Sequence, residues 1–146
     1  MNYESPALAV DVIVLMPNYE KSLGIVLIKR KNHPLGCALP GGFVDVGETT
    51  RTAAIREVKE ELNMDVELVN LLGVYDEPDR DPRKHVVSVA FLAMPVDASA
   101  KPVAGDDAKE AFIWKVDDEM PSLVCDHEKI IREVIDHLPE LPGIPA

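Results

Sequence analysis

The stretch from Gly42 to Met64, GFVDVGETTRTAAIREVKEELNM, constrains the fold of this chain more than any other part of the sequence. A glycine-containing loop leads into a segment that has helical periodicity from about Thr50 onward. At about 100° per residue, three carboxylates fall within about a 100° arc of this helix. They are Glu57, Glu60 and Glu61. A second arc of about the same width is apolar and predicts the face that packs on a core. Its members are Ala54, Ile55, Val58 and Leu62.

The ends of the predicted helix carry residues that suit helix caps. Thr49 or Thr50 can serve as the N-cap, and Asn63 can adopt the left-handed conformation that ends a helix. Like charges three or four positions apart destabilise an isolated helix by about 0.2–0.5 kcal/mol per pair. We therefore expect a cation to compensate the carboxylates.

The turn before the helix suggests a further partner for these carboxylates. On its own, an E-x-x-E-E pattern usually indicates a solvated helix face. Here Leu39-Pro40-Gly41-Gly42 supplies turn residues that let backbone carbonyl groups come close to a ligand. Because carboxylate and carbonyl oxygens are the ligands that hard divalent cations prefer, the pattern indicates Mg²⁺ or Mn²⁺.

These residues resemble the signature box of the Nudix hydrolases, G-x5-E-x7-R-E-U-x-E-E-x-G-U, in which U is a bulky apolar residue. The matching positions are Gly42, Glu48, Arg56, Glu57, Val58, Glu60, Glu61 and Met64. The one departure is Asn63, which stands where the family has glycine. Asparagine tolerates a positive φ better than most residues, so the turn is expected to survive the change.

The resemblance implies the Nudix α/β/α sandwich, a mixed sheet between helical layers, and hydrolysis of a diphosphate linkage with a divalent metal. By position, Glu57, Glu60 and Glu61 would bind the metal, and the Gly41 carbonyl would complete its shell. The family pattern gives Glu48 and Arg56 the role of a supporting pair.

The general base is left open by the resemblance, because family members use either a box glutamate or an acid from a later loop. We expect Glu61 first. The second choice is the loop from Ala104 to Glu110, whose acids are Asp106, Asp107 and Glu110. Asp107 and Glu110 are also candidate substrate contacts.

Length and charge limit the remaining possibilities. The 146 residues, 47% of them hydrophobic, fit one domain spanning the chain. The net charge of −11 argues against nucleic acid or an anionic membrane as a partner. Cys37 and Cys125 form no C-x-x-C pair, and no stretch of 18 apolar residues occurs, so we expect a soluble cytoplasmic protein.

Outside the box, the sequence predicts five strands and a second helix. The strand ranges are Ala7 to Met16, Gly24 to Lys31, Val66 to Tyr75, His85 to Met94 and Ala111 to Lys115. The first two strands should form a hairpin whose turn opens at Pro17, and Gly73 should bend the third. Asp11 is the one charge in the first strand, and we interpret it as a structural polar contact or a dimer-edge residue.

The second predicted helix begins at Asp126 and is interpreted as scaffold. Its apolar stripe consists of Ile130, Ile131, Val134, Ile135 and Leu138. His127-Glu128 does not extend to a zinc-binding H-E-x-x-H, because position 131 is Ile131. The proline-rich tail from Pro139 to Ala146 is expected to be mobile or docked on a partner subunit.

Substrate choice must come from residues outside the box. Tyr75 to His85 is a charged loop in which Arg80 and Arg83 can contact phosphate and Tyr75 can stack on a base. Arg30 is a further candidate for a phosphate or ribose contact. Pro78 lies fifteen residues after Asn63, which resembles the Nudix members that hydrolyse ADP-ribose.

The sequence therefore predicts a Mg²⁺-dependent enzyme that hydrolyses ADP-ribose to AMP and ribose 5-phosphate. One alternative is a pyrophosphohydrolase that removes oxidised nucleoside triphosphates of the 8-oxo-dGTP type. Another is a non-catalytic module that binds ADP-ribose. By resemblance alone, a homodimer formed through the N-terminal strands is expected.

Overall fold

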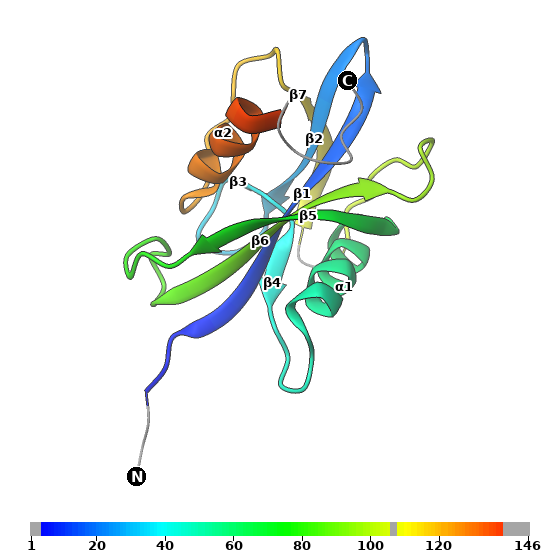
Figure 1. Ribbon diagram of the computed structural model, residues 1–146. Coiled ribbons are helices and arrows are strands. Elements are labelled where there is room, and N and C mark those ends of the chain that lie inside the picture. Colours follow the sequence, from blue (N-terminus) through cyan, green and yellow to red (C-terminus); the bar gives the residue numbers. More distant parts are fainter. Residues whose placement is uncertain (1–3, 106–107, 139–146) are drawn as a thin grey trace.

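A computed structural model describes residues 4–105 and 108–138, which form seven strands and two helices (Figure 1). In chain order they are β1 Ala7–Tyr19, β2 Ser22–Arg30, β3 Cys37–Ala38, β4 Gly41–Phe43, α1 Thr50–Leu62, β5 Val66–Tyr75, β6 Val86–Pro95, β7 Ala108–Lys115 and α2 His127–His137. The predicted tail from Pro139 to Ala146 lies outside the described residues. No helix among the described residues is long and apolar enough to cross a membrane.

Strand β1 is the centre of a mixed sheet. The order along the main path is β3-β2-β1-β6-β5, with β4 paired to β1 and β7 paired to β2. β1 runs parallel to β6 and antiparallel to β2 and β4. The predicted hairpin of the first two strands and the mixed character of the sheet are both confirmed.

Alternate residues of β1 pack into two separate cores. Val10, Val12 and Val14 join the core beneath α1, whereas Ile13 and Leu15 join the core beneath α2. Because successive side chains of a strand point to opposite faces, one apolar strand can serve both layers. Figure 1 shows α1 and α2 on opposite sides of the sheet, so the predicted α/β/α sandwich is confirmed.

Helix α1 begins and ends at the predicted caps. The Thr49 hydroxyl accepts a hydrogen bond from the Thr52 amide, and Asn63 has the left-handed values φ 54 and ψ 34. The predicted apolar face was wrong at Ile55, which is 42% exposed. The buried arc instead includes Ala53 and Glu61, so the core-facing side of α1 is rotated toward its acidic residues.

Several predicted strand limits were also wrong. β1 continues past Pro17 to Tyr19, and the turn lies at residues 20–21. The pairing register of β1 with β2 shifts between Met16 and Tyr19, which accommodates the proline within the strand. β7 starts at Ala108, three residues before the prediction. The predicted second strand reaches only Arg30. The predicted bend at Gly73 is confirmed by the register shift of β5 beside it.

The segment 103–105 closes the C-terminal end of α1. The Val103 amide donates to the Leu62 carbonyl at 2.8 Å, and the Gly105 amide donates to the Glu61 carbonyl at 2.8 Å. The Asn63 side chain also donates to the Val103 carbonyl at 2.9 Å. These bonds satisfy carbonyls that a helix end leaves unpaired. They also fix the backbone of α1 where Glu60 and Glu61 stand.

Replacing Gly105 with alanine should destabilise this contact. A Cβ atom at position 105 would lie 1.7 Å from the Glu60 carbonyl oxygen, so the segment must move away from α1. We expect the free energy of unfolding to fall by about 1–3 kcal/mol, measured by urea denaturation. Ala104→Ser, which adds one heavy atom at an exposed neighbour, is the control and should stay within about 0.5 kcal/mol of the original chain. A Gly105→Ala variant as stable as this control would contradict the prediction.

Candidate active site

Arg56 is the cation that the acidic face of α1 requires. Its Nε lies 2.7 Å from Glu48 Oε2, and its Nη1 lies 2.7 Å from Glu57 Oε1 and 3.2 Å from Glu60 Oε2. Its Nη2 donates to the Phe43 carbonyl at 3.1 Å. One guanidinium group therefore joins three carboxylates to the backbone of β4, and the predicted pair of Glu48 and Arg56 is in contact.

The charge of Glu48 is stabilised by its neighbours. Hydrogen bonds from Arg56, followed in strength by the bond from the Asp45 amide, lower the pKa of Glu48 to about 2. The hydrogen bond to Glu48, followed by the one to Glu57, raises the pKa of Arg56 above its usual value. Both groups remain charged over the whole physiological pH range.

Two glycines allow the loop to lie directly against the carboxylates. A Cβ atom at Gly42 would lie 2.5 Å from the carboxyl carbon of Glu57, and one at Gly41 would lie 2.1 Å from the Val10 carbonyl oxygen. The Gly41 amide donates to Glu61 Oε2 at 3.2 Å. Glycine is needed at position 41 because a Cβ atom would meet the backbone of β1, and at position 42 it leaves the Glu57 carboxyl group in its place against the turn.

The donors gathered around this loop suit a hard divalent cation. Glu57 lies against Gly42, Glu61 lies against Gly41, and Glu60 is one helix position before Glu61. All of these side chains offer carboxylate oxygens, which Mg²⁺ and Mn²⁺ accept. Within the described part of the chain, no three acidic, histidine or cysteine side chains are already close enough to hold a metal. Glu57 and Glu60 point to Arg56 instead.

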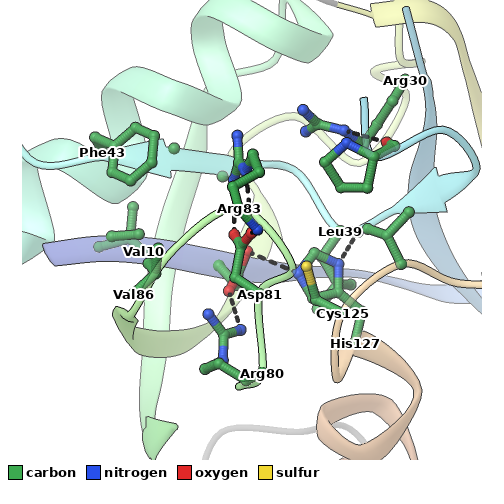
Figure 2. Close-up of a pocket in the computed structure, with 16 residues that line it drawn as sticks. Val10, Arg30, Leu39, Phe43, Arg80, Asp81, Arg83, Val86, Cys125 and His127 are labelled. Atoms are coloured by element: carbon green, nitrogen blue, oxygen red, sulfur yellow. Dashed lines mark hydrogen bonds and ion pairs between the residues drawn. The ribbon is translucent and has the colours of Figure 1, made fainter. Parts of the chain in front are cut away.

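A pocket is lined in part by Gly41 and Gly42 (Figure 2). Its walls come from β1, the segment 30–43, the segment 80–86 and the start of α2. Arg30 and Arg83 both line it. Arg30 Nε donates to the Pro34 carbonyl at 2.8 Å, and Arg83 is held by Asp81 through Nε at 3.0 Å and Nη2 at 2.7 Å. Each guanidinium group is thus fixed by a neighbour at the pocket.

An aromatic ring forms part of the same wall. The Arg83 guanidinium carbon lies 5.5 Å from the centre of the Phe43 ring, and Lys84 Nζ lies 5.0 Å from it. Phe43 is 37% exposed. The pocket therefore combines cationic groups with an exposed aromatic surface, which suits a ligand that has both phosphate and ring groups.

The other predicted substrate contacts occupy different places. Arg80 lines the pocket, but its side chain is only 3% exposed and its Nη2 lies 2.6 Å from Asp126 Oδ1. Tyr75 lies in a separate pocket beside α2, where its hydroxyl donates to Glu133 Oε2. Arg80 is thus paired with Asp126 and Tyr75 with Glu133, whereas the sequence analysis proposed both as substrate contacts.

The predicted loop acids are only partly described. Glu110 lies on β7 and forms an exposed ion pair with Lys29 at 3.4 Å. Asp106 and Asp107 lie outside the described residues. The segment that leads to them, ending at Gly105, contacts the carbonyl of Glu61 at the end of α1.

The sequence interpretation missed one polar cluster beneath the pocket. Asp11, Ser88 and His127 are in contact there, together with Arg80. The predicted structural polar contact of Asp11 is confirmed by its bonds to Ser88 and His127, and the alternative of a dimer-edge residue is wrong because Asp11 is 7% exposed. The alternation of side chains along β1 could have revealed the contact. Asp11 lies two residues before Ile13 and so faces the same side of the sheet, where α2 begins at His127.

A family model and a relative of known sequence both match most of this chain. Residues 5–138 match the family described as the NUDIX domain. The chain is 50% identical over 133 residues to the ADP-ribose pyrophosphatase of Methanocaldococcus jannaschii, covering 90% of this chain and 74% of that protein.

Two solved structures show the same architecture. A MutT/nudix family protein from Enterococcus faecalis superposes with a TM-score of 0.81 at 33% identity, covering 99% of this chain and 68% of that one. A bifunctional NMN adenylyltransferase/ADP ribose pyrophosphatase from Francisella tularensis, complexed with AMP and a Mn ion, has a TM-score of 0.80 at 27% identity. That match covers 94% of this chain and 43% of the Francisella chain.

The pair of Glu48 and Arg56 should make stability depend on pH. The folded pKa of Glu48 is about 2, below its usual 4.5, so its contribution is complete above about pH 4.5 and is lost as the pH falls toward 2. Glu48→Gln should therefore reduce the slope of unfolding free energy against pH between pH 4.5 and 2.5, measured by urea denaturation. Glu128→Gln, at an exposed position of α2, is the control. Equal slopes in Glu48→Gln and the original chain would contradict this assignment.

Proposed function

The chain belongs to the Nudix hydrolase family, and on this premise we propose that it hydrolyses ADP-ribose to AMP and ribose 5-phosphate. The observation that carries the reaction type is the set of box acids, which Arg56 gathers beside the Gly41–Gly42 turn. The choice of substrate is supported by the 50% identity to the Methanocaldococcus ADP-ribose pyrophosphatase.

We propose Mg²⁺ as the working metal, with Mn²⁺ as a substitute. Glu57, Glu60 and Glu61 would hold it through their carboxylates, and Gly41 through its carbonyl. When bound, such an ion screens the charge of a diphosphate and lowers the pKa of a bound water. The Mn ion named for the Francisella structure supports the same class of metal. The metal would replace Arg56 as the partner of Glu60.

The protein's own groups orient the reaction. Arg56 and Glu48 stay charged and hold α1 to β4, which keeps Glu57 and Glu61 beside the glycine turn. We propose that Glu61 accepts the proton of the attacking water, because its carboxylate lies at this turn and is fixed by the Gly41 amide. The water oxygen then forms the new P–O bond as the bridging P–O bond of the diphosphate breaks.

The pocket beside the turn is the proposed substrate site. Arg30 and Arg83 are each fixed through Nε by an acceptor of the protein, so less conformational freedom is lost when they bind a phosphate oxygen. Phe43 offers a ring surface for the sugar or base. Figure 2 shows both arginines and Phe43 around one opening.

A dimer and a cytoplasmic location complete the proposal. The dimer is proposed from the family resemblance alone. The cytoplasmic location is proposed because Cys37 and Cys125 are free thiols, which are typical of a reducing compartment. Size-exclusion chromatography with light scattering would give the mass of the protein in solution and decide between monomer and dimer.

A substrate panel tests the proposed activity. Purified protein with Mg²⁺ should release AMP from ADP-ribose with a higher kcat/KM than for any other nucleotide tested. The panel should contain other nucleoside diphosphate sugars and 8-oxo-dGTP, with detection of nucleotide and phosphate products. Rapid release of pyrophosphate from 8-oxo-dGTP, without AMP from ADP-ribose, would assign the enzyme to the nucleotide-sanitising class. Binding of ADP-ribose without turnover at any divalent metal would indicate a non-catalytic module.

Replacing Glu61 with glutamine should affect chemistry more than folding. The amide oxygen of the substituted side chain can still accept the Gly41 hydrogen bond, but it is neither a charged ligand nor a base. We expect kcat to fall at least about 10²-fold while the midpoint of thermal unfolding stays within about 3 °C. Glu67→Gln on the exposed face of β5 is the control, with unchanged kcat. Near-normal turnover in Glu61→Gln would remove Glu61 from the site.

A further inference from the structure

A polar cluster of low exposure lies in the wall of the pocket, and the activity proposed above gives it no role. Its members come from four segments: Asp11 on β1, Arg80 before β6, Ser88 on β6 and His127 at the start of α2. They are 7%, 8%, 0% and 6% exposed. Burying so many polar groups is unfavourable unless each one is paired, and such an arrangement imposes a specific geometry.

Asp11 is the centre of this cluster. Its Oδ2 accepts from the Ser88 hydroxyl at 2.6 Å and lies 3.3 Å from Arg80 Nη2, and its Oδ1 lies 3.2 Å from His127 Nε2. Although burial alone would raise the pKa of Asp11, its hydrogen bonds with His127 and Ser88 and the charge of Arg80 lower it. The carboxylate is therefore charged and has a partner on each oxygen.

The His127 ring joins Asp11 to the main chain before the glycine turn. The Leu39 amide donates to His127 Nδ1 at 3.0 Å. A backbone amide can only donate, so Nδ1 carries no proton and the ring proton is on Nε2, which donates to Asp11. The ring is thus held between one donor and one acceptor in a single tautomer. Figure 2 shows the bond between Leu39 and the His127 ring.

The segment that His127 holds follows β3 and leads directly to the proposed metal site. The Pro40 carbonyl accepts from the Val12 amide at 2.9 Å, and the Gly41 amide donates to Glu61 Oε2 at 3.2 Å. A Cβ atom at Gly41 would lie 2.9 Å from Asp11 Oδ1, so the Asp11 side chain contacts the turn from below. His127 and Asp11 therefore fix the turn at two successive points, Leu39 and Gly41.

We propose that His127 is a positioning residue for the hydrolysis, acting through Leu39 on the Gly41 amide and carbonyl. A ring displaced from the Leu39 amide would let the turn shift relative to Glu61, which would weaken metal binding and slow the reaction. This proposal rests on the proposed function for its kinetic test, but metal binding can be measured without turnover. Groups that orient metal ligands from outside the coordination shell commonly change metal affinity or activity by about 10- to 100-fold.

Two substitutions at position 127 separate positioning from packing. His127→Phe keeps a ring but removes both hydrogen bonds. His127→Gln keeps an acceptor for the Leu39 amide and a donor for Asp11, because the oxygen and nitrogen of its amide are joined through one carbon, as the two ring nitrogens of histidine are. We expect His127→Phe to lower kcat by about 10- to 100-fold with KM within about threefold, and His127→Gln to restore kcat to within about fivefold of the original chain.

Binding of Mn²⁺ to the metal-free protein, followed by electron paramagnetic resonance, supplies the second measurement. His127→Phe should bind Mn²⁺ about tenfold more weakly, and His127→Gln about as tightly as the original chain. Val134→Ala is the control, because it removes buried volume from the same helix without touching the cluster. It should lose stability while keeping kcat and Mn²⁺ affinity.

Three results would overturn the proposal. They are unchanged kcat and Mn²⁺ affinity in His127→Phe, equal losses in the Phe and Gln variants, and equal losses of kcat and affinity in Val134→Ala. If His127→Phe does not fold, Asp11→Asn tests the same link, because an amide nitrogen facing Nε2 cannot accept its proton. Asp11→Asn should then show the same loss. Failure of the original chain to cleave ADP-ribose while the Mn²⁺ results hold would count against the substrate only.

Discussion

The repulsion among the carboxylates of α1 is the constraint on which this structure depends. Glu57, Glu60 and Glu61 share one side of a helix that is also partly buried, and Arg56 neutralises two of them while binding Glu48 and the Phe43 carbonyl. A helix with these acids would be less stable without that cation. Because the same guanidinium group holds β4, compensating the charge also brings the glycine turn to the acids.

Two further features make this approach possible. The glycines at positions 41 and 42 leave no Cβ atom between the turn and its neighbours, which are the Val10 carbonyl and the Glu57 carboxyl group. Alternation along β1 places valines beneath α1 and brings Asp11 into contact with His127, the first residue of α2. The two helices therefore act on the turn from opposite faces of the sheet: α1 supplies the acids, and α2 supplies His127.

Most of the fold and the box could be predicted because their signals are local. Caps at Thr49 and Asn63 depend on a few neighbouring residues, and strand alternation repeats over short distances. The errors arose where contacts between segments far apart in the sequence decide which side chains are buried and which are paired. The burial of Glu61 instead of Ile55 depends on how α1 is rotated on the sheet, and the pairing of Asp11 with His127 joins residues more than a hundred positions apart. No local pattern reveals that Arg80 is bound to Asp126, or that Arg83 lies on Phe43.

The central claim is that the box acids and the Gly41 turn together form one metal site that serves hydrolysis. Anomalous diffraction from crystals grown with Mn²⁺ tests it most directly, since it locates the ion without reference to turnover. We expect a peak about 2.0–2.3 Å from carboxylate oxygens of Glu57 and Glu61 and from the Gly41 carbonyl oxygen. A peak confined to the acids near Tyr75, such as Glu77 and Glu133, with none at the turn, would contradict the account.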